Sequence, residues 1–373
     1  MLYYLSQYLQ TIWGPFRLLG SHLMLLSVGT MLAGLITWFL LPKLWHVLPT
    51  DRCKNLAADG GGESKGKPTG AGLIFTLLLL PCILLFVPLS VWGYLTLLSL
   101  YACMYFGYAD DASKIPWGEL KKGLLDLLVA VAAAFFIYKE CGSTIWIPFT
   151  KATFHLPVWL YVFIAVCVLW LTMNATNCSD GVDGLAGSLS LMSLASLAIL
   201  LYAVIGYAPI AKYLLIPTNP LAARWAILAM VTSGTLAGYL WYNADPSRVL
   251  MGDAGSRFLG MLVGIEVLIS GNPFFVFVVA TVVLANGGTG LFKIALLRIF
   301  RIMGFDARDP KKLSEEQKEK QFALIKVLHI VRFPLHDHFR AKKGWSKGQV
   351  LLRFLLIQSF LTPLLFILLI KIR

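Results

Sequence analysis

Long apolar stretches alternate with short polar segments along almost the whole chain. A transmembrane helix needs roughly 17 to 25 predominantly apolar residues, and ten stretches approach or reach that length. They lie near 22–42, 72–90, 91–108, 123–139, 157–173, 185–206, 224–242, 256–270, 274–297 and 350–370. The eighth is short and contains Glu266. This pattern predicts a polytopic membrane protein.

The composition excludes a soluble protein. Hydrophobic residues make up 58% of the chain, charged residues make up 14%, and the mean hydropathy is +0.74. A soluble domain carries about 25% charged residues. Backbone groups must be satisfied inside lipid, and the apolar stretches have the length of helices and not of barrel strands. We therefore expect an all-α bundle of about ten transmembrane helices, with residues 1–373 as a single integral-membrane domain.

The placement of Lys and Arg predicts how the chain is oriented. The net charge is +13, and nearly all loop cations fall on the odd-numbered connections between spans. These connections lie near 43–71, 109–122, 174–184, 243–255 and 298–349, the last being a large charged loop. By the positive-inside rule they are cytoplasmic, which leaves both termini outside. The charge follows topology and no recognition module accompanies it, so the expected partner is membrane lipid and not nucleic acid.

Two adjacent carboxylates, Asp110 and Asp111, follow the third apolar stretch. Each resists dehydration and each repels the other, so a pair at the end of a membrane-length segment is costly. One interpretation is a water-exposed pair at a helix end, balanced by Lys114. The other is a site for a metal bound to phosphate, or for a general base.

Polar residues also cluster between the fifth and sixth stretches, in the block Asn174–Gly187. Asp180 and Asp183 lie near the start of the next predicted helix, whose N-terminus offers free N–H groups to an anion. A simple turn needs fewer polar side chains. Carboxylates and amides this close favour hydrogen bonding to a sugar or nucleobase, and binding of a hard cation.

A third block, Trp241–Ser256, precedes the eighth stretch. Asp253 lies between glycines, so the backbone can approach a ligand closely. Mg²⁺ is normally held by one or two carboxylates plus substrate phosphates, which makes Asp253 a natural ligand. Arg248 would help to neutralise phosphate charge. The alternative is a Gly-Asp turn that caps the next helix.

A His-Asp-His element lies in the last large connection, with His336 and His338 on either side of Asp337. A zinc site would need further ligands that the sequence does not offer, so the alternative is a surface or packing role. All four motifs, and the loop of glycines and lysines around Lys67, fall on odd-numbered connections. We therefore predict one composite cytoplasmic site, with carboxylates for Mg²⁺, basic groups for diphosphate and amides for a nucleotide or sugar.

The order and spacing of these motifs resemble the polyprenyl-phosphate hexose-1-phosphate transferase superfamily, and within it the phospho-N-acetylmuramoyl-pentapeptide transferases. The segment Lys67–Gly72 is similar to the family's Pro-Thr-Met-Gly-Gly loop. After it come the Asp-Asp pair, an Asn-x-x-Asn-x-x-Asp-Gly-x-Asp-Gly-Leu-Ala block, and a Trp-Tyr-Asn…Met-Gly-Asp-x-Gly-Ser block. The resemblance covers nearly the whole chain, and it implies the ten-span layout with both ends outside.

The resemblance also implies a reaction and a location. Phospho-N-acetylmuramoyl-pentapeptide would move from UDP-N-acetylmuramoyl-pentapeptide to undecaprenyl phosphate, with release of UMP and formation of lipid I. This is the first membrane step of peptidoglycan synthesis. The implied cofactor is Mg²⁺, the implied assembly is a homodimer, and the implied location is the bacterial cytoplasmic (inner) membrane.

The same resemblance implies roles for individual residues. Asp253 would hold Mg²⁺, with Asp180 as a second ligand. Asp110 would act as a base or orient the acceptor, with Asp111 beside it. His336 would complete the catalytic set. The substrate-binding set would be Lys67, Thr69, Lys114, Lys122, Asn174, Asn177, Asp180, Gly181, Asp183, Asn243, Arg248 and His338.

The chain departs from the family pattern in several places. The family's His-His-His-Phe-Glu element reads His-Asp-His-Phe-Arg here, which puts roles for Asp337 and Arg340 in doubt. Leu250 stands where many members have an aromatic residue near the uridine, which weakens base stacking. The segment 303–332 reads as an insertion before the His element.

The chemistry of phosphoryl transfer indicates which carboxylates matter most for catalysis. Phosphoryl transfer asks a protein mainly to position groups and neutralise charge, and a phosphate acceptor with a second pKa of about 6 is mostly dianionic near pH 7. A base therefore contributes less than a metal, and Asp253 ranks above Asp110. The rival scheme makes Asp111 a nucleophile that forms a phospho-enzyme. The basic segment near Lys122 aligns loosely with the family, so Lys121 is the alternative to Lys122 as the residue that contacts phosphate.

Two other functions are alternatives. A polyprenyl-phosphate N-acetylglucosamine-1-phosphate transferase would share the Asp-Asp pair and the Mg²⁺ chemistry, but the His-x-His-Phe element and the Trp-Tyr-Asn block favour the muramoyl enzyme. An ion-coupled transporter usually places its carboxylates near the bilayer midplane, in broken helices. The carboxylates here lie at the ends of spans on one side.

Overall fold

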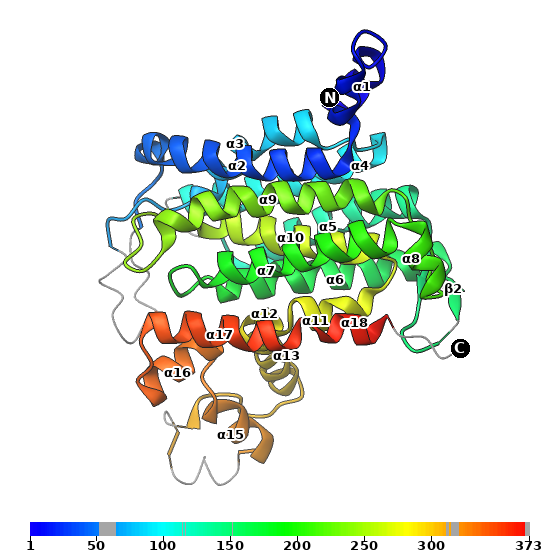
Figure 1. The fold of residues 1–373 in the computed structure, drawn as a ribbon. Helices are drawn as coiled ribbons and strands as arrows, with labels where there is room; N and C mark the ends of the chain where they lie inside the picture. Colours follow the sequence, from blue (N-terminus) through cyan, green and yellow to red (C-terminus); the bar gives the residue numbers. More distant parts are fainter. Residues whose placement is uncertain are drawn as a thin grey trace.

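The computed structural model describes residues 1–51, 65–113, 115, 117–150, 152–310, 313–314 and 321–369. Over these residues the chain is mostly helical, and its long helices run side by side (Figure 1). The elements are α1 (Leu2–Leu9), η1 (Gly14–Gly20), α2 (His22–Leu44), η2 (Trp45–Val47), α3 (Ala71–Phe86), α4 (Val91–Ala112), α5 (Glu119–Cys141), β1 (Thr144–Trp146), β2 (Thr153–His155), α6 (Val158–Ser179), α7 (Leu185–Ile199), η3 (Leu200–Ile205), α8 (Ala208–Tyr213), α9 (Ala222–Asn243), α10 (Gly252–Ile269), η4 (Pro273–Phe275), α11 (Val276–Val279), α12 (Thr281–Val283), η5 (Leu284–Gly288), α13 (Thr289–Ile302), α15 (Ala323–Ile330), α16 (Leu335–Lys343), α17 (Lys347–Leu361) and α18 (Leu364–Leu368).

The apolar stretches of the sequence form helix over most of their length, although residues 87–90 at the end of the second stretch are not helical. Two of them are interrupted, because the ninth is divided among α11, α12, η5 and α13, and the last is divided between α17 and α18. Within the described residues, four helical segments are long and apolar enough to cross a membrane: His22–Val47, Val158–Ser179, Leu185–Ile205 and Thr281–Ile302. The membrane-protein class follows from these segments. The total of about ten spans and the orientation stay predictions.

The expectation of a purely α-helical chain is wrong in one place. Strands β1 and β2 form an antiparallel hairpin between α5 and α6, with Ile145 opposite Phe154. The two segments are rich in β-branched and aromatic residues, which favour strands. Trp146 anchors the hairpin, because its indole is buried and donates a hydrogen bond to the carbonyl of Ser270, at 3.0 Å. A pair of three-residue strands in a short connection leaves too little pattern to detect.

Helix α10 lies at the centre of the bundle, and each of its residues from Ala254 to Ile269 is buried. Glycines let its neighbours approach closely. A methyl group on Gly107 of α4 would lie 2.6 Å from the carbonyl oxygen of Asp253, and one on Gly72 of α3 would collide with the backbone of Gly255. Helices in lipid pack closely through such small residues. The first turn of α10 is therefore fixed against α3 and α4.

The described ends of the chain lie away from the segment that carries the His element. In Figure 1, α17 runs from α16 at the left toward the C-terminus at the right, and α1 projects at the upper right. The acidic motifs lie at the end of the bundle where α4, α6 and α9 finish and α10 begins, as their contacts show below.

Candidate active site

Backbone contacts join two loops that are far apart in the sequence. The N–H of Leu250 donates to the carbonyl of Pro68 at 2.8 Å, and the N–H of Ala71 donates to the carbonyl of Leu250 at 3.0 Å. Gly70 and Gly252 both have positive φ, +85° and +72°, which only glycine adopts readily. A side chain at Gly252 would collide with the carboxylate of Asp111. The Gly-Lys loop and the Asp253 loop thus form one surface.

Charges alternate along a chain of side chains from three helices. Lys122 of α5 pairs with Asp110 of α4, and its Nζ lies 3.5 Å from Oδ2 of Asp253. Arg257 lies 3.5 Å from the same Oδ2 through Nη2, and 2.5 Å from Asp126 of α5 through Nη1. The order Asp110, Lys122, Asp253, Arg257, Asp126 therefore alternates in sign. Each charge is compensated by its neighbours, which limits the cost of burial.

The adjacent carboxylates Asp110 and Asp111 face different partners. Asp110 is buried and accepts a hydrogen bond from the backbone N–H of Trp117 at 2.8 Å, in addition to its pairing with Lys122. Asp111 accepts from the backbone N–H of Ala254, at 3.3 Å, in the first turn of α10. The interpretation of a water-exposed pair at a helix end does not fit this geometry, because both carboxylates are built into the cluster.

The block at the end of α6 delivers Asn177 and Asp180 to the same cluster. With its amide oriented so that both ends are satisfied, Asn177 donates to Asp253 Oδ1 and accepts from Arg257 Nε, each at 3.2 Å. Asp180 lies just beyond α6. Burial, together with the charges of Asp253 and Asp183, raises the pKa of Asp180 to about 7. A cation bound between these carboxylates would relieve their repulsion.

Asp183 is the centre of a second network. Its Oδ2 lies 3.3 Å from Lys347 Nζ and accepts from the backbone N–H of Ser247 at 3.4 Å. Burial alone would raise the pKa of Asp183, but the charge of Lys347 and the hydrogen bonds from Ser247 outweigh it, and the pKa lies below the usual value. Lys67 joins the network by donating to Ser247 Oγ at 3.1 Å.

Asn243 connects these loops from the end of α9. Its Nδ2 donates to the carbonyl of Val249 at 2.8 Å, and its Oδ1 accepts from the N–H of Gly184 at 2.9 Å. Asn243 is buried. Both ends of its amide are used by backbone, so in this structure it shapes the loops that surround Asp183.

The His element meets the acidic block through His336. Its backbone N–H and its Nδ1 both contact Asn286 Oδ1, at 2.9 Å and 3.1 Å. Burial lowers the pKa of His336, so the ring is neutral near pH 7. With Nδ1 donating to Asn286, Nε2 is left as the acceptor, and a methyl group on Gly181 would collide with it. The π-helical turn η5 presents Asn286 to α16.

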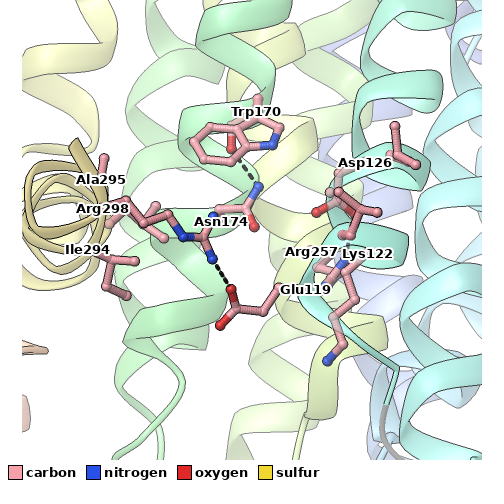
Figure 2. A pocket seen from close by; sticks show the side chains of 13 residues that line it. Glu119, Lys122, Asp126, Trp170, Asn174, Arg257, Ile294, Ala295 and Arg298 are labelled. Carbon is pink, nitrogen blue, oxygen red and sulfur yellow. Dashed lines mark hydrogen bonds and ion pairs between the residues drawn. The ribbon is translucent and has the colours of Figure 1, made fainter. Parts of the chain in front are cut away.

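A cavity of about 720 Å³ opens beside the alternating cluster, between α5, α6, α10 and α13 (Figure 2). Both polar and apolar residues line it. The polar residues are Glu119, Lys122, Asp126, Asn174, Arg257 and Arg298, and the apolar wall is formed by Leu120, Gly123, Leu124, Trp170, Leu291, Ile294 and Ala295. An amphiphile with a charged head and an apolar tail matches such a lining.

The residues present fit one Mg²⁺ ion. Within the described part of the chain, no group of three or more His, Cys, Asp or Glu side chains forms a metal cage. Mg²⁺ usually takes one or two carboxylates and completes its shell with water and substrate phosphates. Asp253 and Asp180 supply that number, and burial, together with the charges of Asp253 and Asp183, raises the pKa of Asp180. The donor set is therefore oxygen-rich and suited to a hard cation.

The remaining residues proposed from the sequence lie at the edge of these networks or outside them. Arg248 is exposed and forms no ion pair within the described residues. The amide of Thr69 donates to the carbonyl of Pro49 at 2.8 Å, and Nδ1 of His338 accepts from the backbone N–H of Arg332 at 3.2 Å. Asn174 donates to the carbonyl of Trp170 at 2.9 Å and lines the cavity. Lys114 lies outside the described residues.

Lys121 and Lys122 occupy different surroundings. Lys121 stacks on the ring of Trp117, 3.5 Å from its centroid, whereas Lys122 contacts Asp110 and Asp253. The structure therefore places Lys122 in the cluster and Lys121 beside it. The role of Lys122 toward phosphate stays a prediction.

Sequence reasoning missed Asp126, Arg257, Lys347 and Asn286, whose side chains contact residues that it did predict. A signal existed for the first two, because each is a charged residue inside a predicted span, and intramembrane charges are functional candidates by default. Lys347 and Asn286 carried no comparable signal. They reach the site only because α17 and η5 fold against the acidic block.

Comparison with known proteins agrees with the geometry. Residues 92–271 match the model of glycosyl transferase family 4. The phospho-N-acetylmuramoyl-pentapeptide-transferase of Treponema pallidum (strain Nichols) is 41% identical over 369 residues, 98% of this chain and 95% of the relative. Proteins with the same name from Helicobacter pylori (strain ATCC 700392 / 26695) and Helicobacter acinonychis (strain Sheeba) are each 29% identical, over 93% of this chain and 94% of each relative. With that identity over nearly its whole length, the chain belongs to the phospho-N-acetylmuramoyl-pentapeptide-transferase family.

Proposed function

We propose that this chain transfers phospho-N-acetylmuramoyl-pentapeptide from UDP to undecaprenyl phosphate, releasing UMP and forming lipid I. The observation that carries the proposal is the alternating cluster around Asp253, which adjoins a cavity with one apolar wall. A reaction between a water-soluble nucleotide sugar and a lipid phosphate needs a charged site and an apolar groove at one point. The names of the curated relatives support the same reaction.

The donor would bind on the Asp183 side of the site. Lys67, Ser247 and Lys347 meet there, and Asn243 holds the surrounding loops together. Amide, hydroxyl and carboxylate groups suit a uridine and a sugar, and lysines suit a diphosphate. The acceptor would enter through the cavity, with its isoprene units against the wall that includes Trp170.

The transfer step needs little proton chemistry from the protein. An oxygen of the acceptor phosphate attacks the sugar-linked phosphorus in line, a new P–O bond forms, and the P–O bond to UMP breaks. The acceptor is mostly dianionic near pH 7, so Asp110, which is already paired with Lys122, would orient that cation and not remove a proton. Asp253 and Asp180 would hold Mg²⁺, which when bound supplies charge neutralisation on the leaving UMP.

A covalent route through Asp111 is the competing scheme. In this route Asp111 would attack the same phosphorus first, and the acceptor would then displace it. The backbone N–H of Ala254 donates to Asp111 Oδ2, and such a donor stabilises the ionised carboxylate without activating it. Exchange of labelled UMP into the donor in the absence of lipid would support the covalent route, and trapped phosphosugar-enzyme would prove it.

The proposal includes a cellular setting. We place the chain in the bacterial cytoplasmic membrane with about ten spans, both termini outside, the site on the cytoplasmic face and a homodimer as the assembly. Labelling of single cysteines introduced at the tips of successive connections would test the topology. Reagents added from outside should reach the even-numbered connections and not the odd-numbered ones. Cross-linking in membranes would test the dimer.

The activity is tested with purified protein, UDP-N-acetylmuramoyl-pentapeptide and undecaprenyl phosphate. We expect UMP release that needs both the lipid and Mg²⁺. UDP-N-acetylglucosamine in place of the muramoyl donor tests the sister transferase reaction. The proposal would be contradicted if UMP were released from UDP-N-acetylglucosamine but not from the muramoyl donor. Uptake of a solute without any UMP release would also contradict it.

A further inference from the structure

Asp126 and Arg257 form an ion pair inside the bundle. Asp126 is 3% exposed and Arg257 is 4% exposed, and Nη1 of Arg257 lies 2.5 Å from Oδ1 of Asp126. Dehydrating two charges is costly, and apolar residues in place of such a pair are often neutral or stabilising. The two residues lie in α5 and α10, within otherwise apolar segments. A role beyond packing is therefore needed to explain the pair.

The hydrogen-bond donors of Arg257 are only partly used. A guanidinium carries five N–H groups in a fixed plane. Nη1 contacts Asp126, Nη2 lies 3.5 Å from Asp253 Oδ2, and Nε lies 3.2 Å from the amide oxygen of Asn177. One N–H on Nη1 and one on Nη2 are left without a partner among the described residues. Three contacts thus fix the plane, and two donors remain for a ligand.

The cavity places a ligand beside those donors. Arg257 and Lys122 both line it (Figure 2). Both also lie 3.5 Å from the same oxygen of Asp253. The outer part carries the Glu119–Arg298 pair, whose side chains are 80% and 61% exposed. The cavity therefore leads from an exposed ion pair to a buried one, with the apolar wall along its side. A lipid phosphate that enters head first meets two cations at the inner end.

We propose that Arg257, held by Asp126, is a binding residue for the phosphate of the lipid acceptor and forms with Lys122 a two-cation seat for a polyprenyl monophosphate. The inference rests on the proposed function, because it assumes that the cavity takes the acceptor. Arg257 and Lys122 complement each other. The planar guanidinium of Arg257 fixes the orientation of the phosphate oxygens, and the ammonium of Lys122 adds a mobile point charge. The seat selects a phosphorylated polyprenol over the free alcohol.

The test removes the charge of the buried pair without leaving either member unpaired. The double variant Asp126→Asn/Arg257→Gln replaces both charges with neutral amides that carry hydrogen-bond donors and acceptors, and the glutamine is shorter than the arginine. We expect its KM for undecaprenyl phosphate to rise about tenfold or more, the range for loss of a charge-assisted hydrogen bond. Its KM for the UDP donor should change by less than about twofold, since the donor site lies with Asp183. Arg257→Lys, which keeps the charge, should fall between this variant and the parent.

A binding measurement makes the result independent of turnover. Thermal unfolding in detergent at saturating Mg²⁺ is measured with undecaprenyl phosphate, with undecaprenol and with dioleoyl phosphatidate. We expect the parent chain to be stabilised most by undecaprenyl phosphate, and the double variant to respond alike to the phosphate and the alcohol. Equal stabilisation of the parent by phosphatidate would overturn the assignment to the polyprenyl acceptor.

The matched control is Asp306→Asn/Arg308→Gln, an exposed pair of the same composition away from the cavity, with side chains 34% and 60% exposed. It should leave both KM values and the lipid preference unchanged. A folded Asp126→Asn/Arg257→Gln variant with the parent's acceptor KM and lipid preference would show that the buried pair is structural and would overturn the inference. Failure of the parent to release UMP at all would instead reject the proposed function.

Discussion

Asp253 and Asp183 are both paired with cations at the same end of the bundle, yet different parts of the chain hold them. Asp253 lies in the first turn of α10, and its partners Lys122 and Arg257 come from helices. Asp183 lies in the loop between α6 and α7, and its partners are the loop residue Ser247 and the first residue of α17, Lys347. One carboxylate is fixed by packed helices, and the other is fixed by loops that meet.

The difference matches the two tasks of a transferase. Reacting groups must be held within fractions of an ångström, which packed helices provide better than loops. A site for a large soluble donor must open and close around it, which loops allow. We therefore expect changes near Asp253 to lower kcat, and changes near Asp183 to act mainly through the KM for the UDP donor.

The largest effect should come from Asp253→Asn. The variant removes the charge that would hold the metal and that Lys122 and Arg257 both approach. We expect kcat to fall by about 10³-fold or more, the size of a lost electrostatic contact to a transferring phosphoryl group. Metal binding, measured by Mn²⁺ electron paramagnetic resonance, should weaken as well. Asp183→Asn is the comparison variant, and an equal loss of kcat in it would break the distinction between the two networks.

The next largest effect should come from the packing that fixes α10. A methyl group in Gly107→Ala would lie 2.6 Å from the carbonyl oxygen of Asp253, so α4 and α10 must separate. A displacement of about 1 Å at a reacting group can cost about 10²-fold in rate. We expect a loss of that order in kcat with little change in donor KM. Gly14→Ala in η1 is the control, because no heavy atom lies within 4 Å of its added methyl group and it does not line the cavity, and it should behave like the parent.

The helical network, meaning the ion pairs of Asp253 with Lys122 and Arg257, was only partly predictable from the sequence. The pattern located α10, and the position between glycines marked Asp253, because both are local features. The partner Arg257 lies one turn further on and was hidden inside an apolar stretch. The pairing of Lys122 and not Lys121 with Asp110 depends on which face of α5 turns toward α4, and a loosely patterned segment does not determine that face.

The loop network, meaning the contacts of Asp183 with Ser247 and Lys347, was less predictable still. Asp180 and Asp183 stood out as a polar block, but the partners of Asp183 come from a segment more than 150 residues later and from a loop that follows α9. The cavity could not be foreseen at all, because it is made by four helices whose lateral order is a tertiary property. The prediction that the motifs share one site rested on their common side of the membrane, which stays a prediction, and it did not say which atoms touch.

A smaller effect, and a different one, should follow Lys347→Met. Lys347 occupies the first turn of α17, where a cation opposes the helix dipole. Its contacts with the carboxylates of Asp183, at 3.3 Å, and of Asp245, at 3.8 Å, offset that effect. Loss of one charge-assisted contact should raise the KM for the UDP donor about tenfold, with kcat nearly unchanged. Lys343→Met, at an exposed lysine of α16, is the control. A fall in kcat at constant KM would contradict the loop assignment.

The same variant should change the pH dependence. In the parent, the pKa of Asp183 is below its usual value because Lys347 and Ser247 outweigh burial. A depressed carboxylate pKa contributes stability that is present above the unfolded pKa of about 3.9 and lost as the pH falls through the folded pKa. Without Lys347, burial dominates and the pKa of Asp183 rises. We expect the acidic limb of kcat/KM for the UDP donor to move to higher pH in Lys347→Met, and an unmoved limb would mean that Asp183 is not the group that titrates there.

The smallest effect should come from Arg248→Gln. The sequence placed Arg248 in the substrate-binding set, but its side chain is exposed and forms no ion pair within the described residues. Exposed charges are screened, and they contribute about 0 to 1 kcal/mol to a contact. We expect the donor KM to rise by less than about threefold, with the increase shrinking further at high salt. Lys67→Gln, which removes a contact with Ser247 in the same loop network, should have the larger effect. If Arg248→Gln proved the more damaging of the two, Arg248 would have to turn inward when the donor binds, and the loop network would be wider than the Asp183 contacts indicate.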